Sequence, residues 1–154
     1  MNLLAKAKHL KIGMNLWPPL VGAGISIRSI SDDFTKMTVE MKLRWYNRNY
    51  KFTHFGGSLF AMTDPFIMMM FMGILGKEYV VWDKSASIDF IKPGKGTVSV
   101  NFHISQEIIA EVYEATKTGN KYFPKFEIDI LDEDGEVVAK VIKTIYIRKK
   151  RLNK

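Results

Sequence analysis

Alternation of apolar and polar residues runs through most of the chain and predicts a sheet with one wet face. In Thr35–Trp45 every second residue from Met37 onward is apolar, and the residues between them are Lys, Thr, Glu or Arg. Val80–Phe90 and Val98–Ile104 alternate in the same way. This period of two is typical of half-buried strands. For the second strand the pattern predicts Val80, Trp82, Ala86, Ile88 and Phe90 inward, with Asp83, Ser85, Ser87 and Asp89 outward.

Three further strands complete the expected sheet. Ala23–Ile27 is the expected partner of the first strand, with a turn near Ser31–Asp33. Phe126–Ile130 and Val137–Ile147 predict a hairpin across Asp132–Gly135, since an Asp-Gly dipeptide is a strong turn signal. The last strand is apolar at most positions on both sides, which places it centrally in the sheet.

Helical periodicity marks three other segments. Residues 2–12 predict a short amphipathic helix, followed by an extended stretch at Trp17–Pro19 because proline disfavours helix in the residue before it. Gln106–Thr118 follows Ser105, a suitable N-cap. Gly57–Leu75 is apolar on nearly every side, so a helix there must be enclosed by protein. Six strands around one long buried helix predict an α+β fold.

Length and composition agree with one folded domain over residues 1–154. The chain is 47% hydrophobic and contains no Cys, which excludes disulfides, thiol nucleophiles and Cys-type zinc sites. The His, Asp and Glu residues show no metal-ligand spacing. The longest apolar run, Phe66–Leu75, is too short to cross a bilayer. We expect no membrane span, no leader sequence and a cytoplasmic location.

The net charge of +7 is confined to the end of the chain. Lys140–Lys154 holds seven basic residues and no acid, so residues 1–139 sum to zero. Such a tail, here residues 148–154, more often keeps a chain end soluble than binds a phosphate backbone. We therefore do not expect nucleic acid as a partner, although the tail could contact an anionic ligand or an anionic membrane surface.

Gly56-Gly57 is the most informative short motif. Two glycines at the start of a buried helix leave their N–H groups at the positive end of the helix dipole. These amides could hold a thioester carbonyl oxygen as it gains negative charge. The alternative is that the glycines only allow the helix to dock closely on a strand. The sequence leaves both interpretations open.

The motif also carries a resemblance. The chain resembles the hotdog-fold acyl-CoA thioesterases, particularly those of the phenylacetate pathway and an uncharacterised branch of that superfamily. In that family an Asn-containing loop leads to His-Gly-Gly and a buried helix that bears an acid nine residues after the His. Asn49, Phe55-Gly56-Gly57 and Asp64 keep this spacing, and Trp17-Pro18-Pro19 resembles the uncharacterised branch, as does the later Gly22-Ala23-Gly24.

The resemblance implies a hotdog fold, a curved antiparallel sheet wrapped around a long buried helix. It implies a homo-oligomer, a dimer or tetramer, whose site is built from two subunits. The expected partner is an acyl-CoA or acyl-carrier thioester hydrolysed to the free acid, without a cofactor other than the coenzyme A of the substrate. Phe55 stands at the family's His position, whereas His54 lies one residue earlier and would face the opposite side of an extended segment. We therefore expect His54 to be a loop imidazole bonded to backbone, and non-catalytic thioester binding remains an alternative function.

Asp64 is the candidate base. The resemblance implies that it acts from the partner subunit on water or as a nucleophile, with Asn49 orienting the water or the loop. Partial burial would raise the pKa of its carboxyl towards a useful range. The competing interpretation is structural, since Asp64-Pro65 is also a good N-cap followed by proline at the first helical position.

The remaining candidates are substrate-binding residues, each with an ordinary alternative. Met68 belongs to a run of methionines that suits an acyl pocket but also fills a core. Lys92 and Lys95 flank a glycine turn, where they could meet coenzyme A phosphates or stay solvated. His54, Phe55 and Trp17 complete this set.

Overall fold

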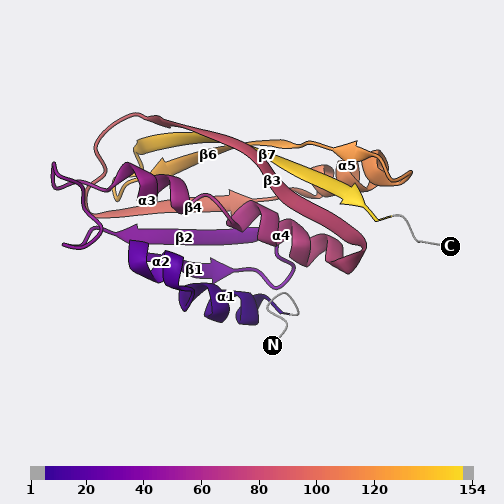
Figure 1. Ribbon diagram of the computed structural model, residues 1–154, viewed down its shortest axis with the longest axis horizontal. Helices are drawn as coiled ribbons and strands as arrows, with labels where there is room; N and C mark the ends of the chain where they lie inside the picture. Colours follow the sequence, from indigo (N-terminus) through magenta and orange to yellow (C-terminus); the bar gives the residue numbers. More distant parts are fainter. Residues whose placement is uncertain (1–5, 151–154) are drawn as a thin grey trace.

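The protein forms a single curved antiparallel sheet with a two-part helix across one face (Figure 1). We describe residues 6–150 of a computed structural model. The strands are β1 (Ile25–Ile30), β2 (Lys36–Lys42), β3 (Tyr79–Phe90), β4 (Thr97–His103), β5 (Lys121–Tyr122), β6 (Lys125–Leu131) and β7 (Val137–Lys149), in the order β1-β2-β4-β6-β7-β3, with β5 also paired to β7. The helices are α1 (Ala7–Asn15), α2 (Pro18–Ala23), α3 (Gly56–Ala61), α4 (Phe66–Leu75) and α5 (Gln106–Thr116), with a 3-10 turn η1 (Gly76–Glu78) after α4.

The core lies between the sheet and the α3–α4 segment. Met62, Phe66 and Met70 are fully buried, as are Val100 and Ile145 from the strands. The segment Gly56–Glu78 is long and apolar enough by length and composition to cross a membrane. Since it packs on the sheet and is interrupted between α3 and α4, it serves here as the central helix of the fold, as its all-round apolar pattern predicts.

Most of the predicted elements are confirmed. β2, β3 and β4 lie within or close to the alternating segments, and β6 and β7 form the predicted hairpin, in which Gly135 has a φ of 80°. Ser105 caps α5 by accepting a hydrogen bond from the Ile108 amide at 3.3 Å. These features depend on local chemistry, which is why the sequence is enough to predict them.

The prediction for the N-terminal segment is wrong in detail. Pro18 and Pro19 do not extend the chain but occupy the first turn of α2, where proline lacks only an amide that would be unpaired. Only Trp17, the residue before them, is extended. α1 runs on to Asn15, and residues 2–5 of the expected helix lie outside the described residues.

The predicted faces of β3 are wrong in its first half. Tyr79 and Val81 are buried, whereas Trp82 is exposed. The pairing register of β3 with β7 shifts between Asp83 and Ser85, an irregularity of the kind that an extra residue produces. Such a bulge reverses the faces on its two sides, so one uninterrupted alternation cannot describe the strand. As a result Asp83 lies towards the interior.

β7 alternates more strictly than its sequence indicates. Its inward residues are apolar except for Lys143, which is buried, while Ile142 on the other face is nearly half exposed. β7 lies between β6 and β3, one strand from the edge. A lysine therefore occupies a core position beneath the central helix.

The two edges of the sheet differ. On β1, the Asn15 side chain exchanges hydrogen bonds with the amide and carbonyl of Ile27, at 2.7 and 3.0 Å, and Lys11 donates to Arg28 O. Helix α1 thus covers the β1 edge (Figure 1). At the other end of the strand order, β3 pairs only with β7 among residues 6–150. The long edge of β3 remains open to another strand.

Candidate active site

A break in the central helix organises the first half of the site. α3 ends at Ala61 and α4 begins at Phe66. Pro65 has no amide hydrogen, and the hydrogen bonds of α4 begin only with the Met69 amide, which donates to Pro65 O at 3.0 Å. The carbonyls of Thr63 and Asp64 accept instead from the Lys143 ammonium, which lies 3.3 Å from Thr63 O and also contacts Asp64 O.

Lys143 joins two carboxylates at this break. Its Nζ lies 3.0 Å from Asp83 Oδ1, an ion pair without hydrogen-bond geometry, and 3.3 Å from Asp64 Oδ1. The Lys143 side chain is 1% exposed. Burial raises the pKa of the Asp83 carboxyl, while the Lys143 charge opposes that rise and the Asp64 charge adds to it. Asp83 and Asp64 are thus the counter-charges of a lysine enclosed by protein.

Asp64 itself points outward. Its side chain is 64% exposed, so the partial burial expected from the sequence is absent within a single chain. The N-cap position of α4 is occupied by Pro65, and no side chain caps that helix. The structural interpretation of Asp64 as a cap is therefore wrong. The Oδ1 atom of the carboxylate contacts Lys143, and its Oδ2 atom has no hydrogen bond or ion pair within residues 6–150.

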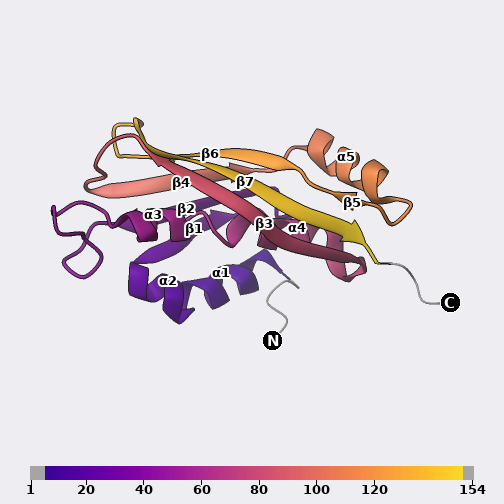
Figure 2. The same ribbon diagram turned by 45° about the horizontal axis from the view of Figure 1, so that its top comes forward.

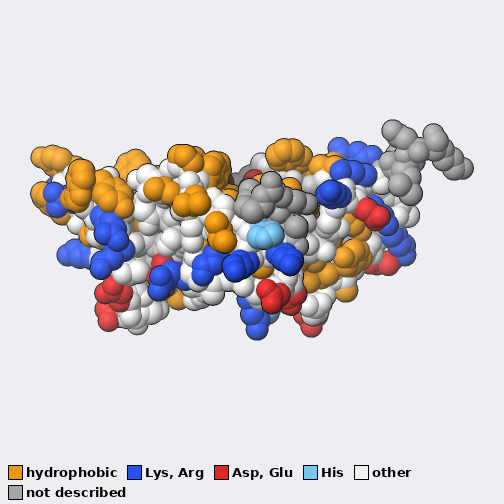
Figure 3. Space-filling view, turned by 90° about the horizontal axis from the view of Figure 1, so that it is seen from below, with side chains coloured by type: hydrophobic (Ala, Val, Ile, Leu, Met, Phe, Trp, Pro, Cys, Tyr) orange, Lys and Arg blue, Asp and Glu red, His pale blue; other side chains and the backbone are white. Residues whose placement is uncertain are grey.

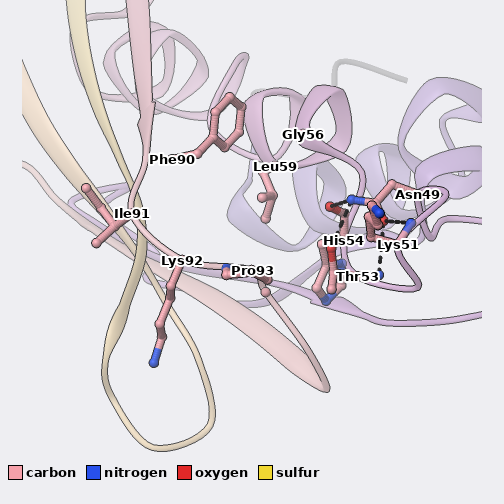
Figure 4. Close-up of a pocket in the computed structure, with 11 residues that line it drawn as sticks. Asn49, Lys51, Thr53, His54, Gly56, Leu59, Phe90, Ile91, Lys92 and Pro93 are labelled. Atoms are coloured by element: carbon pink, nitrogen blue, oxygen red, sulfur yellow. Dashed lines mark hydrogen bonds between the residues drawn. The ribbon is translucent and has the colours of Figure 1, made fainter.

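The start of α3 forms the second half of the site, beside a cavity of about 420 Å³ (Figure 4). The loop before α3, the helix itself and the segment after β3 contribute its walls: Asn49, Lys51, Thr53, His54, Gly56, Leu59, Phe90, Ile91, Lys92, Pro93 and Gly94.

The Gly56 and Gly57 amides make no hydrogen bond within residues 6–150, whereas the next two amides donate to Phe55 O. A Cβ on Gly56 would lie 3.0 Å from the Phe90 ring, and one on Gly57 2.5 Å from the Phe55 ring. Close packing and free amides therefore coexist at these glycines.

Asn49 and His54 fix the loop that borders this cavity. The Asn49 amide donates to Thr53 Oγ1 at 2.9 Å and to His54 O at 3.2 Å, and its oxygen accepts from the Lys51 and Thr53 amides. His54 is 2% exposed, and its Nε2 lies 3.0 Å from Gly96 O, which requires the proton on Nε2. Burial lowers the pKa of His54, which favours the neutral ring. Both side chains hold the loop in place through hydrogen bonds, as the sequence predicts for His54.

The other predicted contact residues are placed as follows. Phe55 is the N-cap of α3 and more than half exposed over Gly57. Met68 is half-buried on α4 against the core, and Trp17 is exposed at the start of α2. Neither Met68 nor Trp17 lines the cavity at the start of α3, so their roles stay predictions.

Lys92 and Lys95 lie in acidic surroundings. Lys92 forms ion pairs with Asp132, at 2.7 Å, and with Glu136, and these partners raise its pKa. Lys92 and Lys95 border a second hollow whose other charged residues are Asp132, Glu133 and Asp134. This hollow does not favour phosphate, although Lys92 also reaches the rim of the first cavity.

The two halves of the site do not meet within one chain. Gly57 and Asp64 are seven residues apart along the central helix, which is about 10 Å at 1.5 Å per residue. Asp64 does not line the cavity beside Gly56. A carbonyl held by the glycine amides is therefore beyond reach of the Asp64 carboxylate of the same subunit.

Sequence reasoning missed Lys143 and Asp83. Lys143 had a detectable signal, because it breaks the inward series Ala139, Val141, Ile145 and Ile147 of β7. Asp83 had none, because the irregularity that turns it inward has no Gly or Pro to mark it. Among residues 6–150, His, Asp and Glu side chains form no group of three that could hold a metal ion.

We predict that Lys143→Met lowers the free energy of unfolding by about 3 kcal/mol, because it leaves the Asp83 carboxylate without its counter-charge. Adding Asp83→Asn should restore part of this loss, because the carbonyls of Thr63 and Asp64 stay without their donor. Lys140→Met is the matched control, because Lys140 lies on the same strand in an exposed pair with Asp129 and should cost less than about 0.5 kcal/mol. Urea unfolding measures all four proteins. Equal stability of Lys143→Met and the wild type would contradict this role.

Comparisons with known proteins give the family and the fold. A family model described as a domain of unknown function, DUF4442, matches residues 6–147. A comparison with curated protein sequences finds no match.

Among solved structures, a Pseudomonas aeruginosa protein of unknown function, PA5026, described as a probable thioesterase, is 20% identical with a TM-score of 0.80, over 92% of this chain and 96% of its own. Haemophilus influenzae thioesterase HI1161 is 12% identical with a TM-score of 0.68, covering 92% and 90%. The Escherichia coli PaaI protein of the phenylacetic acid degradation operon is 19% identical with a TM-score of 0.58, covering 82% and 92%.

These similarities confirm the architecture that the resemblance implies. At 20% identity or less they establish the fold, and the neighbours that carry a functional description are called thioesterases. The chain belongs to the DUF4442 family, and it has the hotdog fold of the thioesterases that are its structural neighbours.

Proposed function

We propose that this protein hydrolyses an acyl-CoA or acyl-carrier thioester to the free acid. The observation that carries the proposal is that the Gly56 and Gly57 amides make no hydrogen bond within residues 6–150, and that Gly56 lines a largely apolar cavity. The amides would stabilise the negative charge that develops on the carbonyl oxygen. The exposed Asp64 carboxylate, at the break in the same central helix, would supply the base. The fold and the descriptions of its structural neighbours support this reaction class.

The proposed chemistry divides between these groups. The glycine amides donate to the thioester oxygen, which gains negative charge when water adds to the carbonyl carbon. Asp64 of the partner subunit takes a proton from that water, the C–S bond breaks, and the thiolate leaves and is then protonated. A thiolate is a good leaving group, so a separate acid is dispensable. Direct attack by the same carboxylate is the variant of this mechanism.

A homodimer would bring the two halves together. The edge of β3 is twelve residues long and open, whereas α1 covers the β1 edge. Pairing of β3 with its copy would continue the sheet about a two-fold axis and lay two central helices side by side in opposite directions. The proposal requires that, in this arrangement, the start of α3 lies beside the partner's Asp64.

Thioester binding without turnover is the second candidate function. It is favoured by one observation, that the family's His position is Phe55 while the neutral His54 ring is committed to Gly96 O. In this account the cavity would hold the acyl thioester and release it unchanged. A panel of acyl-CoA thioesters distinguishes binding from hydrolysis, because only hydrolysis releases free thiol.

A panel of acyl-CoA thioesters of different chain length, with release of free thiol as the readout, tests the reaction. We predict turnover of at least one member, and a decrease in kcat of roughly 10²-fold or more in Asp64→Asn, which removes the proton acceptor but keeps the side chain's size. Binding of acyl-CoA without thiol release would support the binder instead.

Asp129→Asn is the matched control for the loss of one exposed carboxylate, since Asp129 lies on β6 away from the helix break. Both variants should unfold within about 1 kcal/mol of the wild type, because neither side chain is buried. Wild-type turnover in both Asp64→Asn and Asp64→Ala would rule out the carboxylate mechanism.

The assembly has its own prediction. Sedimentation at micromolar concentration should give a dimer or a tetramer, and Ser87→Lys on the exposed face of β3 should shift it towards the monomer by placing like charges across the proposed strand pair. A wild-type protein that sediments only as a 17.7 kDa monomer would refute the shared site.

A further inference from the structure

The loop between β2 and α3 buries three polar side chains and exposes most of its aromatic ones. The buried polar residues are Asn47, Thr53 and His54. Asn47 alone donates to the carbonyls of Ala23 and Lys42, both at 3.0 Å, and accepts from the Arg44 amide at 2.7 Å. The loop exposes its aromatic rings instead: Trp45, Tyr46, Tyr50, Phe52 and Phe55.

The exposure of these rings is large and is fixed by the backbone. Tyr50 is 92% exposed, Trp45 80% and Phe52 65%. Phe52 adopts a φ of 61°, a left-handed conformation that is uncommon for a bulky residue. Since the buried amides hold the loop in one shape, the rings are presented to solvent by a well-ordered scaffold. Contiguous exposed rings of this kind mark an interaction surface.

Along the loop itself the charge is of one sign, whereas the acidic Asp132–Glu136 turn lies beside Gly96, whose carbonyl contacts His54. From Met41 to Thr63 the chain has four basic residues and no acid. The Arg48 guanidinium lies 4.7 Å from the centre of the Phe52 ring, and Lys51 Nζ 5.9 Å from that of Tyr50. Figures 1 and 2 show this loop projecting beyond the sheet at one end of the molecule. Figure 3 shows hydrophobic and basic side chains gathered at that end, with acidic side chains below them.

We propose that this aromatic-basic loop, residues 44–55, docks the protein on a bilayer that contains anionic phospholipid. Trp and Tyr rings favour the membrane interface, because their bodies are apolar and their edges are polar. Each Arg or Lys near an anionic surface adds about 1 kcal/mol of attraction. A projecting tip can enter a flat headgroup layer while the rest of the protein stays in water.

Two other binding partners, a second copy of the chain and single-stranded nucleic acid, fit this loop less well than a bilayer. A second copy meeting this loop through a two-fold axis would bring its three basic residues, Arg44, Arg48 and Lys51, against the same three. Single-stranded nucleic acid is usually bound along a groove that tracks its backbone, whereas these rings stand on a projecting loop. A bilayer satisfies both the charge and the shape.

Docking would have a consequence for the cavity at the start of α3. Asn49, Lys51 and Thr53 belong both to the loop and to the cavity wall, so the cavity would open next to the lipid surface. The inference does not require the proposed hydrolysis, because it concerns only the loop and its surface.

Flotation of the full-length protein with vesicles tests this inference. We expect binding to phosphatidylcholine vesicles that contain phosphatidylglycerol, weaker binding to phosphatidylcholine alone, and loss of binding as salt rises. Trp45→Ser combined with Phe52→Asn should weaken the vesicle partition coefficient about tenfold or more. Asn tolerates the positive φ of Phe52, so the loop keeps its shape.

Two matched controls use the opposite end of the molecule, where α5 and the end of β7 lie (Figure 1). Tyr113→Ser removes an exposed aromatic ring of α5, and Gln at Lys149, Lys150, Arg151 and Lys154 removes four charges of the basic tail. Both controls should bind vesicles like the wild type. The proposal is overturned if the wild type does not float, or if the tail variant loses binding and the loop variant keeps it. It is equally overturned if the loop variant changes only oligomeric state or RNA binding.

Discussion

The contact between the Lys143 ammonium and the broken central helix is the interaction on which the site depends. Pro65 cannot donate to the preceding turn, and the carbonyls of Thr63 and Asp64 are left without a helical amide. In a core, two unpaired carbonyls would each cost about 1–3 kcal/mol. Lys143 satisfies both, and its charge is balanced by Asp83 and Asp64. The break in the helix is therefore stabilised by a buried cation.

This contact determines what Asp64 is able to do. Its backbone and one oxygen are fixed by Lys143, while the rest of the carboxylate faces solvent, away from the cavity beside Gly56. The two chemical groups of the proposed reaction lie on one two-part helical segment, at the start of α3 and at the break before α4, about two helical turns apart. A second subunit is then a chemical requirement of the account, and the open β3 edge provides a place for it.

The sequence predicts those parts of the fold that depend on local signals. Strict alternation in β2 and β4, the cap at Ser105 and the turn before Gly135 each have a short-range cause, and each is found in the structure. The inward turn of Asp83 depends on the register of β3 against β7, which no single segment encodes.

The residues of the candidate site likewise fall into two groups, those predictable from the sequence and those that only the folded structure brings together. Gly56, Gly57 and Asp64 were identified from spacing and resemblance, and His54 was correctly expected to bond to backbone. Lys143, which holds Asp64 in place, comes from a strand 79 residues away in sequence, so only the folded structure brings the two together. The sequence likewise lists the aromatic residues of the loop before α3, but only the structure shows that their side chains are exposed.

The most direct test of a site shared between subunits is complementation between two inactive variants. Asp64→Asn removes the base, and Gly57→Val blocks the amides with a side chain that would meet the Phe55 ring. Co-assembled in equal amounts, the two should regain roughly a quarter of wild-type acyl-CoA hydrolysis, because half of the dimers are mixed and each mixed dimer has one complete site. Mixed dimers that form but hydrolyse no thioester, while wild-type dimers do, would contradict the account.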